Sequence, residues 1–198
     1  MGVPSELQPP RLRPGVPPEL RTPRLRLRAF AESDLDDWAR ITADAETMRF
    51  LGNGRPLSRA EALASLGYVQ AHWALRGYGL WAAEELATGR LVGRIGLYRP
   101  EGWPGLEVGW LVERDRWGEG LATEGARAVV GCAFAAELDD CLISAIQPGN
   151  GASVRVAEKL GARFRESREL EGHRVSIYAL DRQTWLRSHP TRPRQEVR

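Results

Sequence analysis

A glycine-punctuated turn at residues 117–124, Trp-Gly-Glu-Gly-Leu-Ala-Thr-Glu, constrains this chain more than any other feature. It follows a strand-like run, Leu106 to Val112, and precedes an apolar helical stripe that begins at Leu121. A strand, a helix and a further strand in this order imply a parallel pair with a right-handed crossover. The free N–H groups of a first helical turn attract anions, and glycine lets a ligand approach the backbone. The turn therefore predicts a phosphate site, unless Gly118 and Gly120 only shape a tight connection.

Hydrophobic periodicity divides the rest of the chain into short strands and helices. The expected order is strand, two helices, three strands, helix, strand, helix and two strands. The expected strands include Leu25–Leu27, Leu80–Glu84, Leu91–Tyr98, Leu142–Ile146, one from Phe164 and one through Val175–Ala179; the expected helices start near Ser33, after Ser58, at Leu121 and at Ala152. This order predicts an α+β fold, with a mixed and mostly antiparallel sheet and helices on both faces.

The 198 residues suffice for one domain with a sizeable core. Residues 1–20 are rich in proline and predict a disordered tail, and residues 187–198 predict a basic C-terminal tail. The C-terminal tail holds four arginines and one glutamate, a net charge of +3, and the charges of the first twenty residues cancel. Since the whole chain has a net charge of +2, the body at 21–186 has a net charge of −1. A near-neutral body lacks the clustered basic face that nucleic-acid binding needs.

The sequence also excludes several other settings. No run of about 18 apolar residues predicts a membrane span, and the N-terminus has no apolar core of the signal-peptide kind, so we expect a cytoplasmic protein. Cys132 and Cys141 are the only cysteines, and neither has a partner base nearby in sequence. Both are interpreted as small core residues, and no metal site is expected.

Two common phosphate-binding loops fit the turn poorly. A Walker loop ends in Gly-Lys-Ser/Thr, whereas this turn continues Gly-Leu-Ala, and Lys159 is the chain's only lysine. The dinucleotide fingerprint needs a third glycine where this chain has Thr123, and it belongs near the start of a fold.

The chain resembles the GNAT superfamily of acyl-CoA-dependent N-acetyltransferases, especially its RimJ/RimL-like branch of ribosomal-protein acetyltransferases. The resemblance extends from about Arg21 to Trp185. It is carried by four segments in the family's order and spacing: Arg21–Arg28, Thr88–Leu97, Glu107–Val112 with Trp117–Glu124, and Asn150–Ser153 with Glu158–Ala162. One departure is Asp115, which takes the first position of the family's Gln/Arg-x-x-Gly-x-Gly/Ala loop. An acidic side chain there would repel a pyrophosphate, so we expect it to point away.

The resemblance implies a GNAT fold in which a central parallel strand pair splays apart to admit acetyl-CoA. It implies transfer of the acetyl group to a primary amine, foremost the N-terminal α-amine of a protein or peptide, and homodimers are common in the branch. The implied cofactor-binding residues are Leu111, Val112, Arg116, Trp117, Gly118, Glu119, Gly120, Leu121, Ala122, Asn150 and Ser153. A backbone N–H near Leu111 would stabilise the oxyanion.

Two side chains are the candidate catalytic groups. Glu107 opens the signature strand, and the resemblance implies a general base that acts through a water; otherwise it is a strand carboxylate in an ion pair. Ser153 would protonate the departing CoA thiolate, a role compatible with that of a helix-cap hydroxyl. Asn150 would bind the pantetheine arm or form an Asx turn.

The acceptor side is harder to read from the sequence. Tyr78, Trp81 and Trp110 could line it, although large aromatic residues more often lie in a core. His173 could be a second base or a surface residue, and Met48–Gly52 could select the substrate. An acidic run at residues 32–46 keeps a polyamine or aminoglycoside acceptor open, and a non-catalytic acyl-CoA-binding module is a further alternative.

Overall fold

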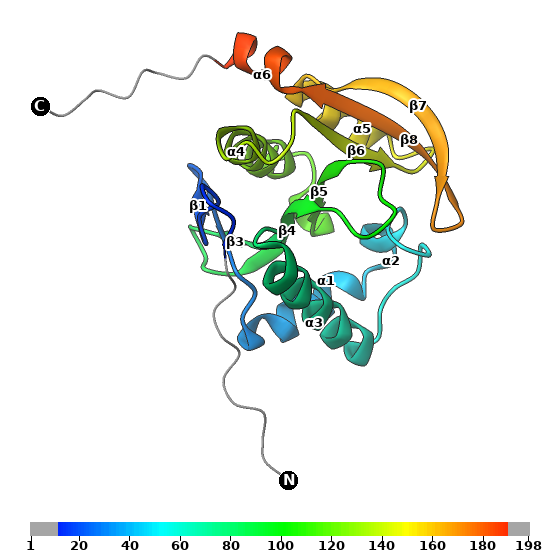
Figure 1. The fold of residues 1–198 in the computed structure, drawn as a ribbon. Helices are drawn as coiled ribbons and strands as arrows, with labels where there is room; N and C mark the ends of the chain where they lie inside the picture. The colour runs from blue at the N-terminus through cyan, green and yellow to red at the C-terminus, as the bar shows by residue number, and fades with distance from the viewer. Residues whose placement is uncertain (1–11, 190–198) are drawn as a thin grey trace, which may run out of the picture.

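The computed structural model describes residues 12–189, which form one eight-stranded mixed sheet with helices on both faces (Figure 1). The strand order is β1-β2-β3-β4-β5-β6-β8-β7. The strands are β1 (Leu20–Arg21), β2 (Leu25–Arg28), β3 (Leu80–Glu85), β4 (Leu91–Tyr98), β5 (Leu106–Val112), β6 (Cys141–Ile146), β7 (Arg163–Leu170) and β8 (His173–Asp181). The helices are α1 (Leu35–Thr42), α2 (Ala45–Met48), α3 (Arg59–Arg76), α4 (Leu121–Ala135), α5 (Gly151–Leu160) and α6 (Arg182–Ser188), with 3₁₀ turns η1 (Glu32–Asp34) and η2 (Arg114–Arg116).

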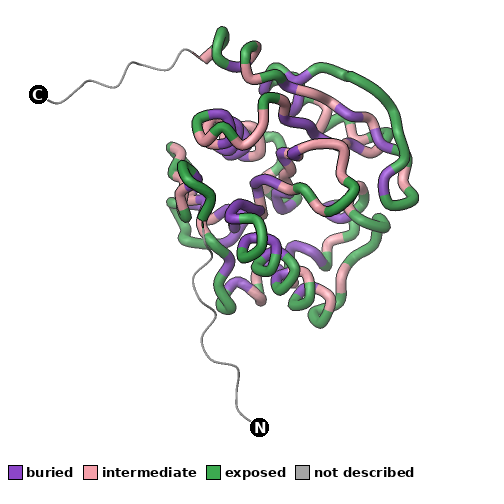
Figure 2. The backbone as a smooth tube through the Cα atoms, in the orientation of Figure 1, coloured by how far each residue is buried: buried purple, intermediate pink, exposed green. Residues whose placement is uncertain are grey.

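The period-two alternation of β4 assigns the helices to the two faces of the sheet. Ile95 packs against α4 so closely that a Cβ on Gly125 would lie 2.4 Å from its Cδ1 atom. Arg94, the preceding residue, lies over the ring of Trp38 in α1, with its guanidinium carbon 5.6 Å from the ring centroid. The face that carries Arg94 therefore meets α1 and α3, and the opposite face meets α4 and α5. Buried residues fill both layers (Figure 2).

The central strands separate where the sequence predicted a splay. β5 and β6 are parallel and pair only at Leu106 with Leu142 and at Glu107 with Ile143. By contrast, β4 pairs with β5 over six residues, and β6 pairs with β8 over six. Beyond Glu107, the edge of β5 that faces β6 is therefore free of ladder hydrogen bonds in the described structure.

Several sequence expectations need correction at the ends of the fold. Residues 12–20 are not a separate tail: Val16 is buried, the carbonyl of Pro18 accepts a hydrogen bond from Trp81, and Leu20 pairs with Leu27 in the unpredicted strand β1. These contacts are non-local, so the proline content alone misled the prediction. At the other end, α6 extends to Ser188 and so includes the first two residues of the expected C-terminal tail. Residues 1–11 and 190–198, the outer parts of the two expected tails, lie outside the described residues.

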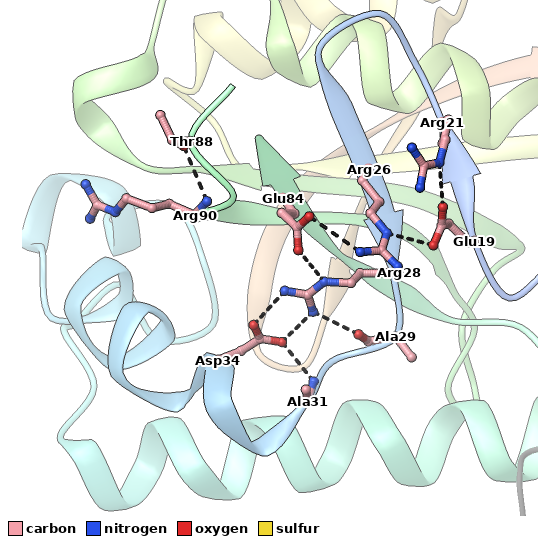
Figure 3. A network of polar contacts seen from close by, with 10 residues as sticks. All are labelled: Glu19, Arg21, Arg26, Arg28, Ala29, Ala31, Asp34, Glu84, Thr88 and Arg90. Atoms are coloured by element: carbon pink, nitrogen blue, oxygen red, sulfur yellow. Dashed lines mark hydrogen bonds and ion pairs between the residues drawn. The ribbon is translucent and has the colours of Figure 1, made fainter. Parts of the chain in front are cut away.

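Ion pairs fix the early strands to each other and to η1 (Figure 3). Arg28 donates from Nε to Glu84 at 2.6 Å, and from Nη1 and Nη2 to both carboxylate oxygens of Asp34 at 2.7 and 2.8 Å. Asp34 also accepts the N–H of Ala31 at 2.8 Å. Each oxygen of the buried Asp34 and the partly buried Glu84 faces a donor, since Arg26 approaches the second oxygen of Glu84 at 3.7 Å. In this part of the sheet, each carboxylate is therefore paired with arginine.

Among residues 12–189, no helix combines the length and the apolarity that crossing a bilayer requires.

Candidate active site

The glycine turn has the backbone geometry of an anion cradle. Gly118 and Gly120 have φ values of +83° and +82°, which glycine adopts without strain, and Gly120 is the N-cap of α4. A side chain on Gly118 would meet no atom within 4 Å. Within residues 12–189, the N–H groups from Gly118 to Thr123 donate to no protein acceptor, and the first amide of α4 that does is that of Glu124. Consecutive free amides at a helix N-terminus suit a phosphate.

Side chains from both flanking segments hold this turn in place. Trp117 donates its indole N–H to the carbonyl of Val112 at 2.7 Å. Arg24, at the start of β2, donates to the carbonyl of Glu119 at 2.9 Å and forms an ion pair with Glu124 at 2.6 Å. Arg116 pairs with Glu85 and, at 3.2 Å, with Glu119. The amides are thus presented by an anchored loop.

Glu107 lies at the point where β5 and β6 part. Its Oε2 accepts the indole N–H of Trp103 at 2.6 Å, and its Oε1 faces the N–H of Ala145 at 3.4 Å across the strand gap. Burial raises the pKa of this carboxyl to about 7, against the opposing effects of these two hydrogen bonds and of Arg94. The residue keeps partial solvent exposure, so a water can reach it. A carboxyl that titrates near neutral pH beside a cleft is suited to general-base chemistry.

Ser153 and Asn150 lie on the other side of the splay, at the start of α5. Asn150 is the N-cap, and its Oδ1 accepts the N–H of Ser153 at 3.1 Å, as the helix-cap interpretation expected. The hydroxyl of Ser153 accepts the indole N–H of Trp110 at 3.2 Å, which leaves its own proton free to be donated. Trp110 therefore belongs to the α5 side of the sheet and not to the acceptor side.

The strand register changes which amide can face the gap. Within one strand, the N–H and C=O groups of a residue point to the same neighbouring strand and alternate along the chain. The carbonyl of Val108 accepts the Ser144 hydroxyl from β6 at 2.8 Å, whereas the N–H of Glu113 bonds to Val92 of β4. Even-numbered residues of β5 thus face β6. The expected oxyanion donor near Leu111 is better placed at the N–H of Trp110 or Val112.

An aromatic cluster occupies the face that carries Glu107. Trp103 meets the ring of Tyr98 edge-on at 5.5 Å, and Tyr98 stacks on His72 and shares a 2.9 Å hydrogen bond with the hydroxyl of Tyr68. Tyr68 is 52% exposed, so the cluster opens to solvent. It forms one wall of the candidate acceptor site.

The aromatic residues chosen from the sequence lie elsewhere. Trp81 is fully buried and meets Trp73 edge-on, and Tyr78 is buried behind His72, so both are core residues. His173 is the first residue of β8, where it pairs with Leu170 at the end of the hairpin.

Several residues of this face were missed from the sequence: Trp103, Arg94 and the rings of Tyr98, Tyr68 and His72. The signal for Trp103 was its spacing, four residues before Glu107 across a Pro-Gly pair. Arg94 alternates in phase with Tyr98 on β4, and its register partner is Leu111. The hydrogen bond of Trp103 to Glu107 and the place of Arg94 on the same face both depend on the fold, so spacing in the sequence does not reveal them.

The two cysteines and a cavity at the β7 edge lie away from this site. Burial raises the pKa of the Cys132 thiol to about 11 and also raises that of Cys141, which disfavours a nucleophilic thiolate. A cavity of about 230 Å³ at the β7 edge is lined by Cys141, Phe164 and Thr184, among others, and includes no residue of the glycine turn or of the Glu107 cluster. Among the described residues, no cluster of potential metal ligands is present.

Comparison with known proteins identifies the family. Residues 24–163 match the acetyltransferase (GNAT) domain, and the chain therefore belongs to the GNAT acetyltransferase family of acyl-CoA-dependent enzymes. An uncharacterized protein of Bacillus subtilis, YkkB, is 35% identical over 107 residues. That match spans 52% of this chain and 62% of YkkB, which is less than two thirds of the relative.

Solved structures show the same fold. An acetyltransferase from Agrobacterium tumefaciens superimposes with a TM-score of 0.72 at 27% identity, covering 82% of this chain and 94% of that one. RimL, a ribosomal L7/L12 α-N-protein acetyltransferase in complex with coenzyme A, gives 0.68 at 18% identity, with 84% and 97% covered. Mycobacterium smegmatis RimJ, in complex with a CoA disulfide, gives 0.68 at 19% identity, with 87% and 88% covered. The last two similarities show the shared fold.

Proposed function

We propose that this protein transfers the acetyl group of acetyl-CoA directly to a primary amine, the N-terminal α-amine of a peptide or protein. The observation that carries the proposal is Glu107, a carboxyl with a pKa of about 7 beside the strand splay and the aromatic wall. An α-amine has a pKa near 8 and a lysine amine near 10.4, so a base of this strength suits the former.

The described residues divide into two groups suited to the two halves of the reaction. The amides of residues 118–123 and the positive-φ glycines fit a pyrophosphate, with Arg116, Trp117, Glu119, Leu121 and Ala122 completing the turn. Bound acetyl-CoA would supply an activated thioester. Its pantetheine arm would lie along the free edge of β5, near the amides of Trp110 and Val112, with Asn150 and Ser153 beside it.

On the opposite face, Glu107 accepts the proton of the attacking amine, directly or through a water, and Trp103 keeps its carboxylate oriented. Ser153 donates its hydroxyl proton as the carbon–sulfur bond breaks. Since Ser153 and Glu107 lie on opposite sides of the splay, the proton is taken from the acceptor side and returned on the cofactor side.

The acidic run at residues 32–46 gives little support to a polyamine or aminoglycoside acceptor. Asp34 pairs with Arg28, Asp36 with Arg59, and Asp37 with Arg40 and Arg90. Their charges are matched by arginines, so they do not form the acidic cleft that a polycation would need.

The test is release of CoA thiol from acetyl-CoA in the presence of peptides, lysine-only peptides, polyamines and aminoglycosides. We expect release with free N-terminal peptides, and acetylation of their α-amine by mass spectrometry. Release with none of these amines, by a protein that binds CoA equally well with and without Glu107→Gln, would support a non-catalytic binding module. The same preparation, examined by analytical ultracentrifugation, tests the predicted homodimer.

A further inference from the structure

Arg94 has no polar partner in the structure. Within residues 12–189, the arginines without a hydrogen bond or an ion pair are Arg13, Arg76, Arg94, Arg155, Arg163 and Arg174, and all of them except Arg94 are exposed. Water satisfies the guanidinium of an exposed arginine. Arg94 is only partly exposed on the face that carries the candidate base, and its nitrogens are not among the fully buried unpaired atoms of the described residues, so its five N–H donors are unpaired but open to solvent and to a ligand.

The surroundings of Arg94 satisfy its charge only in part. Its guanidinium lies over the ring of Trp38, a contact that stabilises the cation but leaves the N–H edges unbonded. Burial lowers its pKa, and Tyr98, Glu107 and Tyr68 oppose that effect through their charge. No carboxylate of the described residues lies within 4.0 Å of it, so Glu107 acts from a distance.

Register and reach connect Arg94 to the acceptor. Arg94 and Tyr98 lie on the same face of β4, about 13 Å apart at their Cα atoms, and Tyr98 pairs with Glu107. The guanidinium lies over the ring of Trp38 on this face, and Tyr98, Tyr68 and Glu107 are near enough to stabilise its charge. The base and the unpaired cation therefore lie on the same face of the sheet as the aromatic wall.

We propose that Arg94 binds a carboxylate of the acceptor, so that the preferred substrate is an amine that also carries an acidic group. In a peptide this group is the side chain of an N-terminal Asp or Glu; in a free amino acid it is the α-carboxylate. Arginine donates two parallel hydrogen bonds to a carboxylate, which would satisfy the N–H edge that the fold leaves free. This inference rests on the proposed function, and it adds the substrate class.

The experiment compares peptides that begin with Asp and with isosteric Asn, using wild type, Arg94→Gln and Arg94→Lys. We expect wild type to favour the Asp peptide by about 10- to 100-fold in kcat/KM, mostly through KM. Arg94→Gln should remove that preference and leave the Asn peptide within about threefold. Arg94→Lys should keep part of the preference, because it retains the charge and loses the fork.

Arg90→Gln is the matched control, since Arg90 is an exposed arginine of the same hairpin that pairs only with Asp37, at 3.4 Å. It should keep the Asp preference of wild type. Free aspartate and asparagine, assayed beside the peptides, distinguish an amino-acid acceptor from a peptide acceptor.

A second measurement does not depend on turnover. Calorimetry with the N-acetylated Asp and Asn peptides, in the presence of CoA, should show tighter binding of the Asp peptide that Arg94→Gln abolishes. Equal binding of the two by wild type, or an equal loss of both in Arg94→Gln, would overturn the role of Arg94. Absence of acetyl transfer with intact Asp-selective binding would instead overturn the proposed catalytic function alone.

Discussion

Two regions of the same sheet treat charge in opposite ways. At the β2–β3 edge, Arg28 is bonded to Glu84 and to both oxygens of Asp34, so cations and carboxylates are matched atom by atom (Figure 3). On the same sheet, where β4 meets β5, Arg94 has no hydrogen-bond or ion-pair partner among residues 12–189, and Glu107 has an indole and a distant amide instead of a cation. Folding alone explains the first arrangement. The second leaves the cation without a carboxylate and the carboxyl without a cation, which is what a substrate with complementary groups requires.

The largest effect should come from Glu107→Gln, which removes the base and keeps the shape. We expect kcat/KM to fall by about 10²- to 10⁴-fold. In wild type, activity should rise with pH through about 7 as Glu107 ionises, and again near pH 8 as the α-amine loses its proton. The variant should lose the first rise and keep the second.

Glu84→Gln is the control, since Glu84 belongs to the ion-paired β2–β3 region. It should lower stability and leave the activity of the folded protein and its pH profile unchanged. An unchanged profile in Glu107→Gln would assign the titration near pH 7 to another group.

The next effect sharpens the contrast between the two arginines. Arg28→Gln leaves the carboxylates of Asp34, which is buried, and of Glu84, which is partly buried, short of a donor. We therefore expect the free energy of unfolding to fall by about 3 kcal/mol, measured by urea denaturation. Arg94→Gln removes only a cation–π contact and should cost less than about 1 kcal/mol. Comparable losses in the two variants would mean that Arg94 has a structural role after all.

Trp103→Phe tests the hydrogen bond that orients the carboxyl of Glu107. The indole hydrogen bond lowers the pKa of Glu107, so its removal should shift the acid limb of the pH profile upward and reduce activity at pH 7 by about tenfold. Trp73→Phe is matched, because Trp73 also donates an indole hydrogen bond, to the carbonyl of Leu80 at 2.9 Å in the core. That control should lose stability without a shift of the limb.

The sequence predicted the parts of this molecule that depend on local rules. The helix that starts after Ser58 and the strand–turn–helix at residues 106–121 follow from residue types at fixed spacing, and the structure contains both. The splayed parallel pair followed from the resemblance to GNAT proteins, and it is also confirmed. The roles of Glu107 and Ser153 stay predictions.

Through-space relations could not be predicted in the same way. Trp81 looked like a pocket residue, but its indole bonds to Pro18, more than sixty positions earlier in the chain. That Arg94 lacks a hydrogen-bond or ion-pair partner among the described residues can be seen only in the three-dimensional structure. The choice of oxyanion donor between the amide of Leu111 and those of its neighbours depends on which β5 amides face β6. Composition does not determine that strand register.

The smallest effect concerns stability, and its sign separates the two kinds of carboxylate. The pKa of Glu107 is about 7 in the folded protein against an ordinary value of 4.5, so the native state holds its proton longer than the unfolded chain does. Its contribution to stability should therefore decline as the pH rises from about 4.5 to about 7. Glu61 behaves in the opposite way: Arg55 and Ser58 lower its pKa to about 2, so its contribution is lost as the pH falls towards that value.

Glu107→Gln isolates the first of these two effects. Relative to wild type, it should gain about 1 kcal/mol of unfolding free energy at pH 8 and almost none at pH 4.5, a modest figure because solvent reaches the carboxyl. Denaturant curves at the two pH values measure the difference directly. If the difference in unfolding free energy between variant and wild type were the same at both pH values, ionisation of Glu107 would not destabilise the folded state. The distinction between this region and the paired carboxylates of the β2–β3 region would then rest on Arg94 alone.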